Sequence, residues 1–211
     1  MKFKIALFDV DSTLIQQEVI DLLAGKTAHK SRVEEITARA MRGELNFSQA
    51  LEERVSLLKG LPESTFESII KEITFSPGAL DFITEFRLHG GFVGAVSGGF
   101  HNVLDILFSN MDLDFLRANT LEVKDGFLTG RTIGPVIDRE AKANALREFA
   151  ADKGIELAQT IAIGDGSNDI SMIELAGLGV SYLGKPILAK AADLVITEPD
   201  LMQLIPVVLS Q

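Results

Sequence analysis

The apolar residues of this chain fall into short runs that alternate with helical patterns. Residues 5–8 (IALF) form an apolar run bounded by polar positions, which is typical of a strand buried on both faces of a parallel sheet. Similar runs predict strands at 92–96, 160–163, 179–182 and 194–196, and residues 118–128 predict a hairpin with a primed turn. Helices are expected at 79–89, 102–109, 139–152 and 170–176. The alternation predicts an α/β fold with a doubly wound, mostly parallel sheet.

Residues 15–74 show a different pattern, with helical periodicity and no predicted strand. Asn46 is a candidate N-cap, and Gln49 stands three residues later, as in a capping box. A small all-helical insertion after the first strand of an α/β chain is typical of a cap over an active-site edge. We therefore expect a catalytic core formed by residues 1–14 and 75–211 and a helical cap domain formed by residues 15–74.

Acidic side chains follow two of the predicted strands. Asp9 and Asp11 come directly after the first strand, and Asp165 and Asp169 lie in the glycine-containing loop after the strand at 160–163. The carboxyl ends of parallel strands form the edge where open α/β sheets bind ligands. Carboxylates at the end of a buried strand must be hydrated, paired or bound to a cation. We interpret Asp9 as a nucleophile and Asp11 as a general acid/base, with Mg²⁺ bound between the acids.

Other acidic motifs fit this pattern less well. An EF-hand loop beginning at Asp9 requires glycine at its sixth position and glutamate at its twelfth, where Leu14 and Ile20 stand. The loop 164–169 (GDGSND) begins like a dinucleotide fingerprint but has an acid in place of the third glycine. The metal-binding Asp-x-Asp of sugar transferases remains a competitor that gives Ser97 no role. The plain structural alternative is a solvated turn that caps a helix.

Ser97, Gly98 and Gly99 follow the predicted strand 92–96. A nucleophile elbow needs glycine two residues before the serine, where Ala95 stands, and no histidine is an obvious partner. A hydroxyl and glycine N–H groups at a helix N-terminus can instead hold a phosphate. A plain strand-to-helix turn is the structural alternative.

Composition and charge narrow the functional classes. The chain has 211 residues, of which 46% are hydrophobic and 24% charged, an ordinary globular balance. Cysteine is absent, which excludes disulfides and thiolate metal sites and fits a reducing cytoplasm. No signal-peptide pattern or membrane-length apolar run is visible. The net charge of −10 argues against nucleic acid and anionic membrane as partners, and a phosphate substrate would need local positive charge.

The order of these motifs resembles that of the haloacid dehalogenase-like hydrolases. The residues that carry the resemblance, along nearly the whole chain, are 9–13 (DVDST), 97–99 (SGG), Lys142 and 164–169 (GDGSND). Within the predicted cap, Glu18, residues 40–43 with 46–47, and residues 54–58 resemble the phosphoserine phosphatases of that superfamily.

The resemblance implies a Rossmann-like core and Mg²⁺-dependent hydrolysis of O-phosphoserine, the last step of serine biosynthesis. Asp9 would form an aspartyl phosphate, and Asp11 would protonate the seryl oxygen and then activate water. The implied metal ligands are Asp9, the main-chain carbonyl of Asp11 and Asp165, with Asp169 in support. The implied phosphate-binding residues are Ser97, Gly98, Gly99 and Lys142. The implied substrate-binding residues are Glu18 for the ammonium, Arg54 for the carboxylate, Met41, Phe47 and Asn168.

Several rival functions stay open at this stage. The nearest are the same chemistry on another small phosphomonoester and phosphoryl transfer to an alcohol acceptor. A phospho-accepting signalling domain needs a long-lived acyl phosphate, so the acid/base at Asp11 argues against it. A catalytically inactive binding protein is disfavoured because every catalytic position holds a competent residue. A monomer or homodimer in the cytoplasm is expected.

Overall fold

The computed structural model describes residues 1–41 and 44–209, the side chain of Met41 excepted. Seven strands form one sheet in the order β4-β3-β2-β1-β5-β6-β7, and every neighbouring pair is parallel except β3 and β4. The strands are β1 (Ile5–Phe8), β2 (Phe92–Phe100), β3 (Phe115–Lys124), β4 (Phe127–Ile133), β5 (Thr160–Gly164), β6 (Leu178–Tyr182) and β7 (Leu194–Ile196). The predicted α/β fold with a mostly parallel sheet is confirmed.

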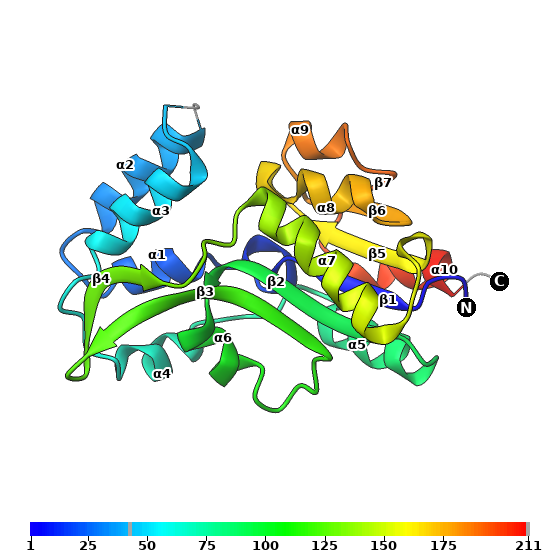
Figure 1. Cartoon of the computed structure of the whole chain (residues 1–211), viewed down its shortest axis with the longest axis horizontal. Helices are drawn as coiled ribbons and strands as arrows, with labels where there is room; N and C mark the ends of the chain where they lie inside the picture. Colours follow the sequence, from blue (N-terminus) through cyan, green and yellow to red (C-terminus); the bar gives the residue numbers. More distant parts are fainter. Residues whose placement is uncertain (42–43, 210–211) are drawn as a thin grey trace.

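Helices cover both faces of the sheet (Figure 1). They are α5 (Ala79–Leu88), α6 (His101–Leu107), α7 (Arg139–Lys153), α8 (Ile170–Leu175), α9 (Pro186–Ala189) and α10 (Ile205–Val208). The central strand β1 alternates between two apolar clusters, as its pleat requires. Ile5 and Leu7 belong to the cluster that contains buried residues of α7 and α8, whereas Ala6 and Phe8 belong to the one that contains those of α5. All four side chains are fully buried.

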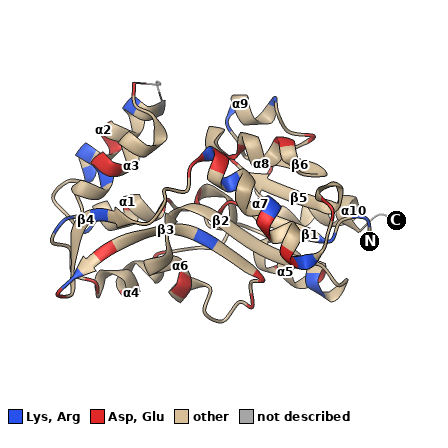
Figure 2. Cartoon of the chain, in the orientation of Figure 1, with Lys and Arg blue, Asp and Glu red and all other residues tan. Residues whose placement is uncertain are grey.

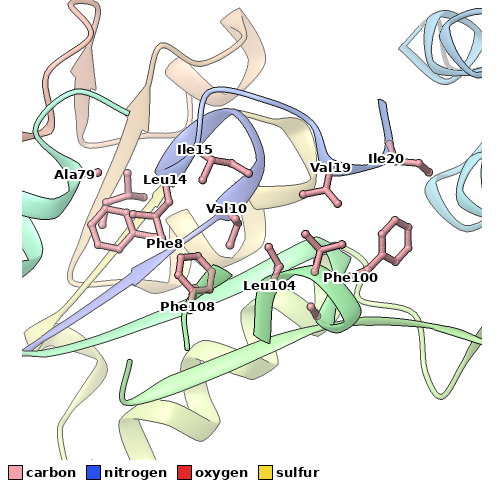
Figure 3. Packing of buried hydrophobic residues seen from close by; sticks show 14 of the residues in the cluster. Phe8, Val10, Leu14, Ile15, Val19, Ile20, Ala79, Phe100, Leu104 and Phe108 are labelled. Atoms are coloured by element: carbon pink, nitrogen blue, oxygen red, sulfur yellow. The ribbon is translucent and has the colours of Figure 1, made fainter. Parts of the chain in front are cut away.

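Residues 15–74, which we call the helical insertion, contain α1 (Val19–Ala24), α2 (Lys30–Met41), α3 (Phe47–Ser56) and α4 (Thr65–Ile70). The predicted capping box is present at the start of α3, where Asn46 Oδ1 accepts from the Gln49 N–H at 2.8 Å and Gln49 Oε1 accepts from the Asn46 N–H. One apolar cluster continues from the sheet into the insertion, through the turn after β1 and the start of α1 (Figure 3). Shared burial therefore joins the insertion to the sheet.

The hairpin formed by β3 and β4 also holds the helical insertion. Its predicted primed turn is confirmed, since Asp125 and Gly126 both have positive φ angles, of 53° and 79°. Main-chain hydrogen bonds then join the hairpin to the chain after α3: Gly60 N–H donates to the Leu128 carbonyl at 2.8 Å, and Leu128 N–H donates to Leu61 at 2.9 Å. The hairpin thus fixes one end of the insertion relative to the sheet.

Strand β2 continues through Ser97 to Phe100, whereas the sequence predicted that it would end at Val96. Its pairing with β3 shifts register between Val96 and Phe100, and Asn119 of β3 donates a side-chain hydrogen bond to the Gly98 carbonyl at 2.8 Å. This irregular pairing keeps the glycine segment extended beside β3.

No helix within residues 1–41 and 44–209 has the length and apolarity that crossing a bilayer requires.

Candidate active site

The carboxyl ends of β1, β2 and β5 meet at one edge of the sheet. Phe8 lies opposite Ala95 on β2 and Ile163 on β5, so the residues that follow these three positions reach the same edge. The Asp9 N–H continues this pairing and donates to the Ile163 carbonyl at 2.8 Å. The acids after β1 and β5 therefore lie side by side, as the strand pattern predicted.

A cavity of about 550 Å³ lies over this edge, between the loops of the sheet and the helical insertion. The loops contribute Asp9, Asp11, Gly98, Gly99, Asp165 and Asn168, and the insertion contributes Glu18, Phe47 and Arg54. The side chain of Met41 lies outside the described part of the chain. Most residues selected from the sequence thus surround one cavity.

Lys142 lies behind the acids rather than in the cavity. Its side chain is fully buried, on helix α7, whose buried residues also include Ala145, Leu146 and Phe149. Its Nζ lies 2.6 Å from Asp9 Oδ1 and 2.6 Å from Asp169 Oδ1. Burial alone would lower the pKa of Lys142, but the charges of Asp169 and Asp9 outweigh burial and raise it. Lys142 therefore stays protonated and joins α7 to the loops after β1 and β5.

Asp169 organises the loop after β5. Its Oδ2 accepts from the main-chain N–H groups of Asp165 at 3.2 Å and Gly166 at 2.9 Å. A Cβ atom at Gly164 would lie 2.5 Å from Asp169 Cγ, so glycine is required where the loop passes over this carboxylate. Because its two oxygens are engaged by Lys142 and by the loop, Asp169 has a structural role in addition to its charge.

The acids at this edge fit a divalent cation. Asp9, Asp165 and Asp169 place carboxylate oxygens within 4.8 Å of one another, and among the described residues Lys142 is the one cation within ion-pair distance of them. Burial, followed by the charge of Asp169, raises the pKa of Asp9 and raises the pKa of Asp165 to about 6. A cluster of oxygen donors with uncompensated negative charge suits a hard metal ion. The residues present therefore fit a metal centre.

Asp11 reaches the cavity through an unusual turn. Its backbone is extended, and Ser12 after it has a left-handed conformation with φ of 57°. The Asp11 carboxylate accepts from the Val19 N–H at 2.9 Å and from the Ser97 hydroxyl at 3.2 Å. Burial, followed by the charge of Glu18, raises the pKa of Asp11 to about 7. A carboxyl group that is half protonated near neutral pH can both donate and accept a proton.

Ser97 is held beneath the glycines rather than exposed in the cavity. Its side chain is fully buried, and its hydroxyl accepts from the Gly99 N–H at 2.8 Å while donating to Asp11. A Cβ atom at Gly99 would lie 2.8 Å from Asp11 Oδ2, so the absence of a side chain there gives Asp11 its position. Ser97 and Gly99 thus orient the Asp11 carboxylate.

The helical insertion supplies a charged and an aromatic wall. Glu18 Oε1 accepts from the Ser12 hydroxyl at 2.7 Å, which directs its carboxylate along the cavity. Arg54 donates through Nε to the Ala50 carbonyl at 3.1 Å, and no carboxylate among the described residues lies within ion-pair distance of its guanidinium. The Phe47 ring lies close to Gly98, where a Cβ atom would be 3.0 Å from its Cζ.

Among the described residues, two charged side chains that line the cavity were not selected from the sequence. Asp21 of α1 lies at the cavity wall, and burial, followed by the charge of Glu18, raises its pKa. Lys185 lies on the opposite side, before α9. No local pattern could have revealed either residue, because a single acid or lysine beside a helix usually faces solvent.

The family model and the most similar curated proteins place this chain in the same family. The sequence model of the haloacid dehalogenase-like hydrolase family matches residues 6–174. The phosphoserine phosphatase of Streptococcus thermophilus is 49% identical over 201 residues, which cover 95% of this chain and 94% of that protein. That of Methanocaldococcus jannaschii is 45% identical over 204 residues, covering 97% of each. In the phosphoserine phosphatase of Streptomyces coelicolor, the matched region is 48% of a longer protein.

Solved structures agree with these relatives. A phospho-aspartyl intermediate analogue of phosphoserine phosphatase has a TM-score of 0.92 and 44% identity, covering 99% of this chain and 100% of that chain. A substrate-bound phosphoserine phosphatase complex has a TM-score of 0.92 and 43% identity, with 99% of both chains covered. The similarity therefore extends over the sheet and the helical insertion together.

Proposed function

This chain belongs to the haloacid dehalogenase-like hydrolases, and we propose that it hydrolyses O-phosphoserine to serine and phosphate with the help of Mg²⁺. The observation that carries the proposal is the pairing of a buried carboxylate, Asp9, with a second carboxyl group, Asp11, at one cavity. The similarity to phosphoserine phosphatases over nearly the whole chain supports the choice of substrate.

Asp9 acts as the nucleophile in this proposal. Its carboxylate attacks phosphorus, the bond from phosphorus to the seryl oxygen breaks, and an aspartyl phosphate forms. Lys142, directly behind Asp9, counters the repulsion between the carboxylate and the approaching phosphoryl group. Gly98 and Gly99 line the cavity on the phosphoryl side, and Ser97 and Lys142 support that subsite from below.

The metal centre would be formed by Asp9, Asp165 and the main-chain carbonyl of Asp11, with Asp169 in support. Mg²⁺ bound there would supply positive charge to the phosphoryl oxygens. Asp169 holds the loop that carries Asp165, through the main-chain N–H groups of Asp165 and Gly166. This arrangement fixes the Asp165 carboxylate beside Asp9.

Asp11 acts as the general acid and then as the general base. Its protonated carboxyl donates to the seryl oxygen as the ester bond breaks, and the resulting carboxylate takes a proton from the water that attacks the aspartyl phosphate. The raised pKa of Asp11, about 7, favours a protonated form at the start of the cycle. The hydrogen bonds from Val19 and Ser97 keep the carboxyl group in place for both steps.

The helical insertion binds the serine part of the substrate in this proposal. We propose that residues 15–74 form a cap domain over a core of residues 1–14 and 75–211. Glu18 suits the ammonium group, and Arg54, with guanidinium donors left for a ligand, suits the carboxylate by bidentate bonding. Phe47, Asn168 and Met41 complete the proposed subsite. A cytoplasmic location and the last step of serine biosynthesis accompany this proposal.

Phosphate release from O-phosphoserine, measured with Mg²⁺ and with EDTA, tests the proposed function. A panel of small phosphomonoesters and an alcohol acceptor are assayed under the same conditions. We expect phosphoserine to have the highest kcat/KM in the panel and EDTA to abolish turnover. A higher kcat/KM for an unrelated phosphomonoester, or phosphoryl transfer to the alcohol in preference to water, would overturn the assignment.

A further inference from the structure

Lys185 is a cation at the cavity that the chemistry above leaves without a role. It directly precedes α9, its side chain is exposed, and it lies at the cavity together with the loop after β5. Its N–H donates to the Asp165 carbonyl at 2.9 Å. The main chain of Lys185 is therefore fixed to that of a proposed metal ligand. Its ammonium group has no hydrogen bond or ion pair recorded with the described residues and can meet a ligand in the cavity.

The backbone before Lys185 is tightly constrained. Leu183 has a left-handed conformation with φ of 47°, although its side chain is 47% exposed and gains little from burial. Its N–H donates to the Ile196 carbonyl at 2.8 Å. A Cβ atom at Gly184 would lie 2.2 Å from Ser181 Oγ, so this loop passes close to β6. These contacts hold residues 183–185 against the ends of β6 and β7 and bring Lys185 to the cavity.

Negative charge exceeds positive charge around the cavity, so an anionic substrate needs a cation such as Lys185 there. Five carboxylates among the described residues line the cavity, and the cationic side chains that line it are Arg54 and Lys185. Lys142 is already engaged by two carboxylates, and Arg54 is on the insertion side, where we place the serine carboxylate. Lys185 approaches from the side of the sheet, where the phosphoryl group would lie. Figure 2 shows the basic residues at the two ends of α9, across from α2 and α3.

We propose that Lys185 is a further substrate-positioning residue, which attracts the phosphoryl group of a phosphomonoester into the cavity and holds it at the edge beside Asp165. The lysine acts on the phosphate, which phosphoserine shares with other phosphomonoesters. The proposal rests on the proposed phosphatase function but not on serine being the alcohol released. A cation facing an acidic cavity strengthens binding of an anionic ligand and speeds its association.

The test compares Lys185→Met with Lys190→Met. Lys190 is exposed at the other end of α9 and does not line the cavity, so its replacement changes the net charge equally without touching the site. Lys185→Arg keeps the charge. The readouts are kcat and KM for phosphoserine and for p-nitrophenyl phosphate, the inhibition constant of inorganic phosphate, and the Mg²⁺ concentration that gives half-maximal activity.

For Lys185→Met we expect kcat/KM to fall about tenfold on both esters and the inhibition constant of inorganic phosphate to rise by a similar factor, with kcat within about twofold of wild type. High salt is expected to shrink the difference, because screening weakens an exposed charge. Lys185→Arg is expected to keep most of the wild-type kcat/KM and phosphate inhibition, and Lys190→Met is expected to behave as wild type.

Equal behaviour of Lys185→Met and Lys190→Met would overturn the proposal. A change confined to the Mg²⁺ requirement, with phosphate inhibition unaltered, would also overturn it and assign the lysine to Asp165 instead. If the wild type hydrolyses p-nitrophenyl phosphate but not phosphoserine, the proposed substrate fails, while phosphate inhibition still decides the role of Lys185. Melting temperatures of the three variants check that each one folds.

Discussion

The Nζ atom of Lys142 lies 2.6 Å from Oδ1 of Asp9, and both side chains are buried. The two residues are far apart in the sequence and come from α7 and the end of β1. A buried ammonium group thus favours the ionised form of the proposed nucleophile, opposing the burial that raises the pKa of Asp9, and fixes one of its oxygens. The other oxygen, Oδ2, accepts no recorded hydrogen bond from a described residue. It can therefore bind a metal ion or attack phosphorus.

Lys142→Met tests this relationship. The variant leaves Asp9 and Asp169 buried without their cation, and removing one partner of a buried ion pair costs about 3–5 kcal/mol. We expect a free energy of unfolding lower by about 3 kcal/mol and phosphatase activity lower by at least about 100-fold. Urea denaturation and phosphate release measure the two effects. The matched control is Lys153→Met at the end of the same helix, where the lysine pairs with Asp152 and lies over the Phe92 ring, away from the acids of the site.

Asp11→Asn separates the two proposed proton transfers. p-Nitrophenolate leaves without protonation, whereas a seryl oxygen requires an acid. We therefore expect the variant to release one equivalent of p-nitrophenol rapidly from p-nitrophenyl phosphate and then turn over slowly, because the aspartyl phosphate waits for an activated water. With phosphoserine we expect no burst of serine. Stopped-flow absorbance measures the release of p-nitrophenol, and quenched-flow assays measure the release of serine. A burst of serine equal to that of wild type would exclude Asp11 as the acid.

The sequence predicted the elements whose signals are local. The run before Asp9 predicts β1 because its four side chains are buried on both faces, and Asn46 with Gln49 predicts the start of α3 because a capping box is a contact between near neighbours. Asp9 and Asp165 could be selected because acids at the ends of apolar strands stand out. These parts of the account needed no tertiary information.

Other features depend on contacts between distant segments. The extension of β2 to Phe100 depends on Asn119 of β3, and no pattern around Ser97 could reveal it. Lys142 could be selected only through the family resemblance, because a lysine on a helix is usually solvated. Lys185 and Asp21 could not be selected at all, since their proximity to the cavity follows from how α9 and α1 pack.

Arg54→Ala tests whether Arg54 binds the carboxylate of the substrate. Hydrogen bonds to a charged group contribute about 1.5–3 kcal/mol, so we expect KM for phosphoserine to rise about 10- to 100-fold. p-Nitrophenyl phosphate has no carboxylate, and its KM is expected to change by less than about threefold. Arg39→Ala serves as the control, because Arg39 pairs with Glu44 and Glu53 on the surface of the helical insertion. Equal losses on both substrates would refute the assignment.

The stabilising effect of Mg²⁺ is expected to grow with pH. Burial raises the pKa of Asp165 to about 6 and the pKa of Asp11 to about 7. A carboxyl group with a raised pKa favours the metal-free fold fully below its unfolded value of about 4, and this stabilisation is lost as pH rises through the folded value. A divalent cation binds the ionised carboxylates and reverses the loss.

We therefore expect Mg²⁺ to raise the melting temperature more at pH 7.5 than at pH 5, relative to EDTA at the same pH. Differential scanning fluorimetry measures the shift. Asp165→Asn removes one of the proposed ligands and is expected to lose most of the Mg²⁺ effect at both pH values. A shift that is the same at both pH values in the wild type, or unchanged in this variant, would contradict a metal centre at these acids.

Trapping the intermediate tests the central claim most directly, namely that Asp9 takes the phosphoryl group from phosphoserine. The enzyme is mixed with phosphoserine and Mg²⁺, quenched in acid within milliseconds and treated with borohydride, which reduces an acyl phosphate to an alcohol. Mass spectrometry of the peptide that contains residue 9 is predicted to find homoserine in place of Asp9, and only when substrate is present. Reduction at Asp11 or another carboxylate, or a burst of serine release with Asp9 unmodified, would contradict the account.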